Sequence, residues 1–206
     1  QRGTVVHLQA ADVSRRDEVL ALVDAAIGRL GAIDALVNNA GIYHVAPFVD
    51  TTPEDFDRVL QVNLYGAWHV MQAVLRHMQA QRQGRVVNIA STAGKWGSMN
   101  QSAYNASKHA LVGLTRCAAL EMAPHQVTVN AICPGFVETD MLGEFSRHAA
   151  LQGVSVEQAM ANARARVPLR RFMQPEDIAE LAVYLASDES RGMTGQSLQI
   201  DGGMLL

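Results

Sequence analysis

Two side chains on one predicted helix carry the most informative chemistry in this sequence. Tyr104 and Lys108 lie four residues apart in the segment Ala103–Met122, whose pattern predicts a helix, so both project from the same face. A lysine ammonium beside a phenol stabilises the phenolate and lowers the phenol pKa from about 10. Such a phenol donates and accepts a proton near neutral pH. We therefore expect acid–base chemistry here; the alternative is a helix face with unrelated polar residues.

Ser91 and Asn63 are two further candidates for this chemistry. Ser91 directly follows the predicted strand Arg85–Ala90, at the carboxyl end where active sites gather in parallel sheets. Its hydroxyl could hydrogen-bond a carbonyl on which negative charge develops, or it could cap a loop. Asn63 lies inside a predicted helix, where asparagine is mildly unfavourable. It could satisfy buried backbone groups, or anchor a water that relays protons toward Lys108.

Short β-branched runs alternate with longer helical patterns along the chain. Ser14 could cap the first helix, and Pro53 occupies the first position of another helix that continues to about Gln81. This alternation is typical of an α/β fold, in which a doubly wound parallel sheet is covered by helices on both faces. The predicted strands are Thr4–Gln9, Asp34–Asn38, Arg85–Ala90, Gln126–Cys133 and Ser197–Ile200.

The composition excludes several classes of function. The length of 206 residues predicts a single domain over 1–206, and the net charge of −3 offers no basic surplus for nucleic acid. No apolar stretch is long enough to span a bilayer, so a membrane is not an expected partner. No motif has metal-ligand spacing, so we expect no metal site. The two cysteines, Cys117 and Cys133, exclude a disulfide scaffold and favour the cytoplasm.

Several motifs, in order along the chain, resemble those of the short-chain dehydrogenase/reductase family. The match extends from Asp12-Val13 to Asp201-Gly202-Gly203. The resemblance implies a Rossmann-type fold, NADP or NAD as the cofactor, and hydride transfer between a carbonyl and an alcohol. The motifs are Asn38-Asn39-Ala40-Gly41, then Asn63, Ser91, Tyr104-Asn105-Ala106-Ser107-Lys108, and Pro134-Gly135-Phe136-Val137-Glu138-Thr139.

The resemblance also implies roles for individual positions. Tyr104 would be the general acid/base, Lys108 would hold the nicotinamide ribose beside it, and Ser91 would orient the carbonyl. Asn63 would hold the relay water. The other cofactor contacts would be Asp12 and Val13 at the adenine ring, Asn39, Ala40 and Gly41 along the groove, and Val137 and Thr139 at the nicotinamide end, after a turn at Pro134 and Gly135.

The start of the chain departs from the family pattern. The family opens with a strand, a glycine-rich turn and a helix that binds pyrophosphate, followed by the strand whose end selects NAD or NADP. No GxGxxG occurs in this sequence, which begins at the position of the family's third strand. We therefore expect a sheet that lacks the first β-α-β unit, as in a chain incomplete or truncated at its start.

The segment 141–167 corresponds to the variable substrate lid of the family. Met141 within it, and Trp96 five residues after Ser91, are expected to line an apolar substrate pocket. Three stretches are similar to 3-oxoacyl-thioester reductases and polyketide ketoreductases, so we expect an acyl-thioester or other small carbonyl substrate. These stretches are Asn88–Lys95, Pro134–Thr139 and Ala165–Pro175.

Two alternative functions stay open. One is a secondary-alcohol dehydrogenase for a small hydroxy acid or cyclic alcohol. The other is an inactive fragment with only an assembly role. The family resemblance further implies a homotetramer, built on the helices Pro53–Gln81 and Ala103–Met122 and on the C-terminal strand.

Overall fold

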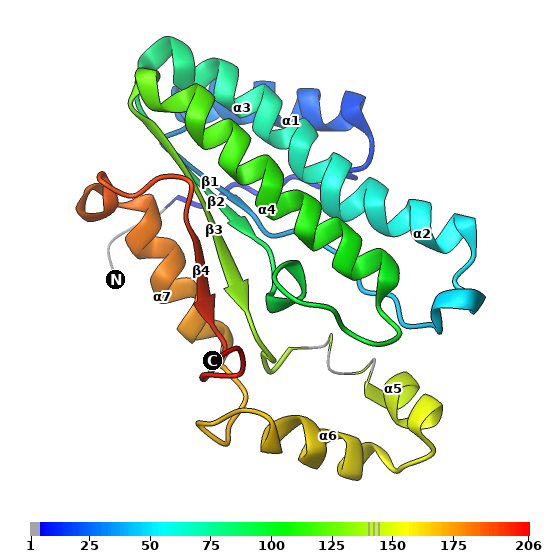
Figure 1. The fold of residues 1–206 in the computed structure, drawn as a ribbon. Helices are drawn as coiled ribbons and strands as arrows, with labels where there is room; N and C mark the ends of the chain where they lie inside the picture. The colour runs from blue at the N-terminus through cyan, green and yellow to red at the C-terminus, as the bar shows by residue number, and fades with distance from the viewer. Residues whose placement is uncertain (1–4, 140, 142, 144) are drawn as a thin grey trace.

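Four parallel strands form the sheet, in the order β1-β2-β3-β4 (Figure 1). The computed structural model describes residues 5–139, 141, 143 and 145–206. The register places Val87 of β2 opposite Val37 on one side and Asn130 on the other, and Ile132 opposite Leu198. The strands are β1 (Ala35–Asn38), β2 (Gly84–Ile89), β3 (Val127–Pro134) and β4 (Ser197–Ile200).

Helices follow the strands in alternation, as the sequence predicts. A π-helical segment, Gln61–Gly66, joins α2 to α3 without a break, so the region from Pro53 to Gln81 is helical throughout. The α-helices are α1 (Arg16–Leu30), α2 (Pro53–Leu60), α3 (Ala67–Gln81), α4 (Ser102–Met122), α5 (Phe145–Gln152), α6 (Val156–Ala165) and α7 (Pro175–Ala186).

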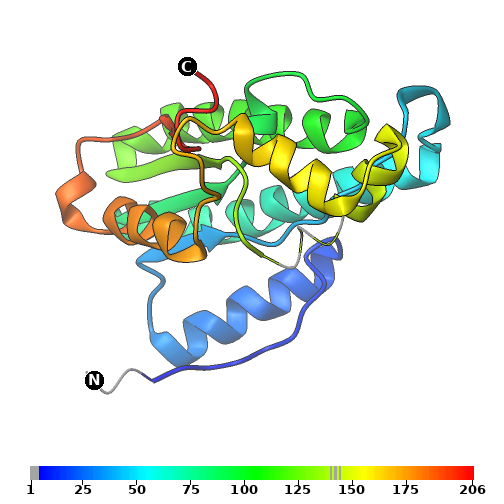
Figure 2. The same ribbon diagram turned by 90° about the horizontal axis from the view of Figure 1, so that it is seen from below.

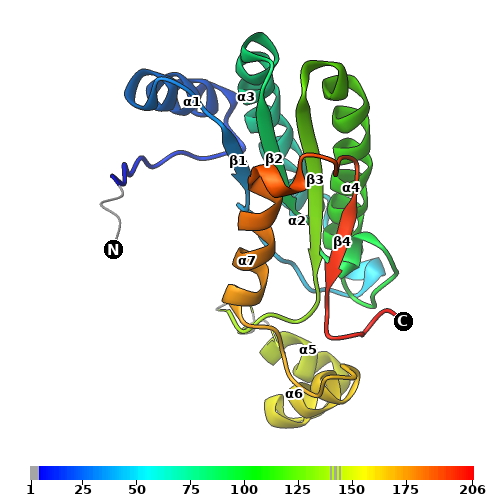
Figure 3. The same ribbon diagram turned by 90° about the vertical axis from the view of Figure 1, so that its left-hand side faces the viewer.

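The sheet has a helical layer on each face, because neighbouring residues of a strand point to opposite sides. Val86 of β2 and Val129 of β3 belong to the cluster packed with α1, α3 and α4. Val87 and Ile132 instead pack with Leu185 of α7 on the other face. Figure 3 shows α7 on one side of the strands and α3 and α4 on the other. The predicted doubly wound fold is therefore confirmed.

The carboxyl ends of the strands point toward α5 and α6, which lie beyond the end of the sheet (Figure 1). Seen from that end, the two helices cross in front of the strands (Figure 2). Polar residues that follow the strands therefore face this pair of helices. This is the region where ligands bind in open parallel sheets.

The predicted strand Thr4–Gln9 is wrong. Thr4 lies outside the described residues, and residues 5–10 form no strand. Val5 and Leu8 are 75% and 89% exposed. A strand needs a neighbouring strand to receive its backbone hydrogen bonds, and no described strand pairs with this segment. The apolar pattern alone therefore did not decide its conformation.

Helix starts show one correct and one wrong prediction. Pro53 opens α2 as predicted, and the Thr52 hydroxyl caps it by accepting a hydrogen bond from the Asp55 N–H at 3.1 Å. Ser14 does not cap α1. The Ser14 N–H and hydroxyl instead donate to the Asp12 carboxylate, at 2.9 and 2.7 Å, which closes a local turn before the helix.

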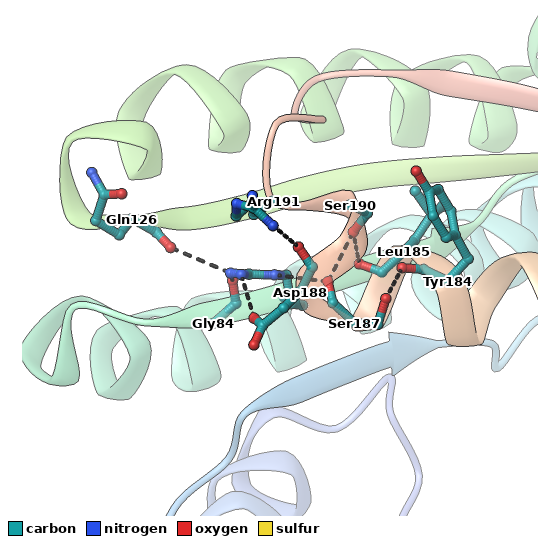
Figure 4. A network of polar contacts seen from close by, with 9 residues as sticks. Gly84, Gln126, Tyr184, Leu185, Ser187, Asp188, Ser190 and Arg191 are labelled. Atoms are coloured by element: carbon teal, nitrogen blue, oxygen red, sulfur yellow. Dashed lines mark hydrogen bonds and ion pairs between the residues drawn. The ribbon is translucent and has the colours of Figure 1, made fainter.

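Arg85, at the start of β2, links this strand to Asp188 in the segment after α7. Figure 4 labels its partners Gln126, Ser187 and Asp188. Its guanidinium contacts the Asp188 carboxylate at 3.1 Å and donates to the Ser187 carbonyl at 3.4 Å. It also donates to the Gln126 carbonyl at 3.5 Å. The arginine side chain is only 11% exposed, so these contacts satisfy a largely buried cation.

In the part of the chain described here, no helix is long and apolar enough to cross a membrane.

Candidate active site

A large cavity opens at the carboxyl ends of the strands. Its volume of about 1220 Å³ exceeds the roughly 300–1,000 Å³ of most small-molecule pockets, so it can hold a long ligand or two ligands together. Residues of α5 and α6 line it opposite the strand ends. The predicted site residues in its wall are Asn39, Gly41, Ser91, Trp96, Tyr104, Lys108, Pro134, Gly135, Val137, Thr139 and Met141.

Tyr104 and Ser91 meet at this cavity from two different elements. Tyr104 is buried in the first turn of α4, and the Ser91 side chain is its hydrogen-bond partner. Ser91 also caps the 3₁₀ turn Thr92–Gly94, since its hydroxyl oxygen accepts from the Ala93 N–H at 3.1 Å. The loop-capping and substrate-facing interpretations of Ser91 are therefore compatible.

Burial dominates the acidity of the phenol. It raises the pKa of Tyr104, and the hydrogen bond from Ser91 opposes that shift only in part. The sequence-based expectation of a lowered pKa is therefore wrong for this structure. The physical reason is distance: the Lys108 ammonium lies 5.6 Å from the centre of the phenol ring. Desolvation of the phenolate outweighs the attraction of that cation.

Lys108 is a buried cation that is hydrogen-bonded to the end of β2. It is 4% exposed, and its ammonium donates to the Ile89 carbonyl at 2.9 Å. Burial lowers the pKa of Lys108 to about 8, because desolvation penalises the charged form. An ammonium has three donors, and one is used within the described part of the chain. The remaining donors suit the hydroxyls of a ribose.

Asn63 lies in the π-helical segment and holds the loop after β1. Its carbonyl oxygen accepts from the Ile42 N–H at 2.7 Å, and its amide donates to the Ile42 carbonyl at 2.9 Å. The same amide donates to the Ser107 hydroxyl at 3.1 Å. These contacts agree with a buried asparagine that satisfies nearby backbone groups. Its role in a water relay stays a prediction.

The turn after β3 brings backbone close to the cavity. The Gly135 N–H donates to the Ile200 carbonyl at 2.9 Å. A Cβ at Gly135 would lie 2.9 Å from the Asp201 Cα, so only glycine fits this approach. Val137 then pairs with Met173 in an isolated parallel bridge, which holds the turn against the segment before α7.

Four predicted site residues do not line the cavity: Asp12, Val13, Ala40 and Asn63. Val13 packs closely on Gly66, where an added Cβ would meet the Val13 side chain at 2.7 Å. Asp12 is engaged in the turn before α1. Their assignment to the adenine ring stays a prediction.

The structure adds a cluster that the sequence reasoning missed. The Tyr43 ring packs edge-on against the Tyr104 ring, with centroids 4.8 Å apart. Its hydroxyl lies 2.6 Å from His148 Nε2 on α5, and the Gln101 amide lies 3.4 Å from the same nitrogen. Only the position of Tyr43, two residues after Gly41, gave a signal in the sequence. His148 is distant in sequence and had none.

The residues present fit a nicotinamide cofactor. The buried Lys108 keeps free donors, and no acidic side chain is found among the described residues of the cavity wall. Backbone at Gly41 lies so close to Lys108 that an added Cβ would be 3.7 Å from its nitrogen. A polar, anionic cofactor therefore meets a cation and close backbone without charge repulsion.

Comparisons with known proteins agree with this geometry. A family model described as enoyl-(acyl carrier protein) reductase matches residues 1–205. The 3-oxoacyl-(acyl-carrier-protein) reductase FabG of Thermotoga maritima is 40% identical over 195 residues, which cover 95% of this chain and 75% of that protein.

Two solved structures share the fold. An NAD+-bound xylitol dehydrogenase superposes with a TM-score of 0.91 at 37% identity, over 95% of this chain and 78% of that chain. A variant of the actinorhodin polyketide ketoreductase with NADPH gives a TM-score of 0.92 at 38% identity, over 95% and 76%. With the phenol, hydroxyl and ammonium gathered at the strand ends, these likenesses show that the chain belongs to the short-chain dehydrogenase/reductase family of NAD(P)-dependent oxidoreductases.

Proposed function

We propose that this protein reduces the ketone of a 3-oxoacyl thioester, or of a related polyketide-type substrate, to a secondary alcohol. The observation that carries the proposal is the pairing of Tyr104 with Ser91 in a cavity large enough for both a cofactor and an acyl chain. The similarity to a 3-oxoacyl-(acyl-carrier-protein) reductase supports the substrate class.

The reacting ketone is held by two hydroxyl groups. The Ser91 hydroxyl donates a hydrogen bond to the carbonyl oxygen, where negative charge builds up during reduction. The Tyr104 phenol then donates its proton to the same oxygen as the alkoxide forms. Because burial raises the pKa of Tyr104, the phenol is protonated at neutral pH and ready to act as an acid. The bound nicotinamide cofactor supplies the hydride.

Residues on the sheet side of the cavity would hold the cofactor. Lys108, whose ammonium also donates to the Ile89 carbonyl, would donate to the ribose, and the backbone at Asn39 and Gly41 would line the groove. Val137 and Thr139, which line the cavity after the Pro134-Gly135 turn, would contact the nicotinamide end. Substrate lies on the other side, between Trp96 and Met141, which also line the cavity.

Two measurements test the proposal. Titration with NADPH and, separately, NADH, followed by nicotinamide fluorescence, should show saturable binding and identify the preferred cofactor. With that cofactor, acetoacetyl thioesters should be reduced with a kcat/KM at least tenfold above the value for acetoacetate or a cyclic ketone. A preference for the free acid or the cyclic ketone would instead identify the protein as a dehydrogenase of small alcohols. Binding of neither cofactor would contradict the proposal outright.

A further inference from the structure

The mouth of the cavity carries a guanidinium that the reaction itself does not use. Arg166 follows α6 and lines the cavity, yet it is exposed, so it lies where the cavity meets solvent. Its Cζ atom is 4.8 Å from the centre of the Trp96 ring, which is a cation–π contact. Stacking on an indole occupies the flat face of a guanidinium and leaves its N–H edge available to a ligand.

Trp96, on whose ring Arg166 stacks, is hydrogen-bonded to the catalytic helix α4. The Trp96 carbonyl accepts a hydrogen bond from the Asn105 side chain at 2.7 Å, and Asn105 is the residue after Tyr104 in α4. The backbone N–H of Arg166 donates to the Ala163 carbonyl at 3.1 Å, which fixes the backbone of Arg166 at the end of α6. The guanidinium therefore has a defined position relative to the reacting phenol.

The charges of the cavity wall favour an anionic ligand. Among its described residues, Lys108 and Arg166 are cationic, and none is aspartate or glutamate. Lys108 is buried and faces the cofactor side, so Arg166 is the cation that remains for substrate. Within the described residues no carboxylate pairs with Arg166, whereas Arg171 is bound to Asp177 at 2.8 Å.

The cavity wall near Arg166 suits an uncharged part of the substrate. Tyr104 is 8% exposed, whereas Arg166 lies at the rim. Small and apolar residues of α5 and α6, among them Leu151, Ala159 and Ala163, line the wall on this side. A ligand that contacts both the phenol and the guanidinium therefore suits this wall if its middle is uncharged and its end is anionic.

We infer that Arg166, held on Trp96, binds the phosphate of a phosphopantetheine thioester whose ketone lies at Tyr104. This inference rests on the proposed function and names the part of the substrate that the cavity mouth recognises. Phosphopantetheine fits because its arm is uncharged and ends in a phosphate, and an arginine binds phosphate through paired charge-assisted hydrogen bonds.

The test compares two substrates that differ only in that phosphate, acetoacetyl-pantetheine 4′-phosphate and acetoacetyl-pantetheine. Arg166→Gln should lower kcat/KM for the phosphorylated substrate about tenfold, chiefly through KM, and should leave the other substrate within twofold. Trp96→Leu removes the ring on which Arg166 stacks, so it should also raise KM for the phosphorylated substrate. Arg164→Gln is the matched control: Arg164 lies two residues earlier, in α6, and stacks on Phe172 at 4.8 Å, but it does not line the cavity.

Binding without turnover separates this inference from the proposed function. Calorimetric titration of pantetheine 4′-phosphate into the wild-type protein should give a dissociation constant about tenfold lower than into Arg166→Gln, even if no thioester is reduced. Equal losses for both substrates in Arg166→Gln would overturn the inference. So would a loss confined to acetoacetate, because that result would assign Arg166 to a carboxylate instead.

Discussion

At Tyr104 and Lys108, burial acts on two acid–base groups in opposite directions. It raises the pKa of the phenol and lowers the pKa of the ammonium, because both charged forms are desolvated. The phenol is thus a ready proton donor, which suits reduction of a ketone. The free-energy cost of burying the ammonium is offset when a cofactor supplies hydrogen-bond acceptors for its free donors.

Tyr104→Phe tests the acid role directly. The variant keeps the ring and its packing against Tyr43 but loses the proton, so we expect kcat to fall by about 10²–10⁴-fold. Cofactor affinity by fluorescence titration should change less than threefold. Tyr184→Phe, a partly exposed tyrosine on α7, serves as the control and should retain full activity. Substantial turnover by Tyr104→Phe would rule out the assigned mechanism.

Lys108→Met tests the cost of the buried ammonium. The pKa of Lys108 is about 8 in the folded protein and 10.5 ordinarily, so the unfolded chain holds more protons between these values. Wild-type stability should therefore rise with pH across that window. The variant does not bury a charge, so its free energy of unfolding at pH 7 should be higher by about 3 kcal/mol, with the difference shrinking toward pH 10.5.

Urea unfolding at pH 7 and pH 10 measures that difference. Lys95→Met is the control, because Lys95 is exposed and its removal should change stability little at either pH. If the free energy of unfolding differed between wild type and Lys108→Met by the same amount at both pH values, burial of the charged ammonium would not be the cause of the difference.

Among the elements, α5 contacts the catalytic helix through Tyr43 and through Gln101 at the start of α4. Tyr43 contacts the Tyr104 ring with its edge and His148 of α5 with its hydroxyl. The hydrogen bond of the Tyr43 hydroxyl and the ring contact with Tyr104 can be removed separately. The ring positions the catalytic phenol, whereas the hydroxyl holds α5 over the cavity.

Tyr43→Phe and Tyr43→Ala should therefore give different kinetic signatures. The phenylalanine variant keeps the ring and loses the contact with His148, so KM should rise several-fold with kcat within twofold of wild type. The alanine variant also loses the ring, so kcat should fall about tenfold or more. Steady-state rates for both variants measure this split. An equal fall of kcat in both would assign the hydroxyl, rather than the ring, to positioning.

For the whole molecule, exposed apolar surface agrees with self-association. Leu120 of α4 is 79% exposed, and Tyr65 and Trp68 of the π-helical and α3 region are 44% and 37% exposed. β4 also ends the sheet, so one edge of it is unpaired within the described chain. These features lie on the long helices and the C-terminal strand, where the sequence resemblance implies tetramer contacts.

Sedimentation velocity should then show a species of four chains. Leu120→Lys places a charge on the exposed face of α4 and should shift the distribution toward smaller species. Leu30→Lys, at the end of α1 and 60% exposed, is the control and should not change the sedimentation coefficient. A monomer at micromolar concentration in the wild-type protein would contradict the tetramer.

The sequence by itself determined most elements and the positions that carry chemistry. Four of its five predicted strands form the sheet, and Pro53 opens a helix as expected. These features depend on local signals, such as β-branched runs and proline at a first helical turn, which neighbouring residues alone determine. The order of the motifs was enough to indicate the family and, within the cavity, Tyr104, Lys108 and Ser91.

Only the tertiary structure decided which distant side chains meet and what burial does to them. His148 and Arg166 reach the cavity from segments far from Tyr104, and no local pattern marks such contacts. The sign of the Tyr104 pKa shift depends on desolvation, which spacing along a helix does not reveal. The segment 5–10 has the pattern of a strand but no partner, since backbone pairing is a property of two strands rather than one.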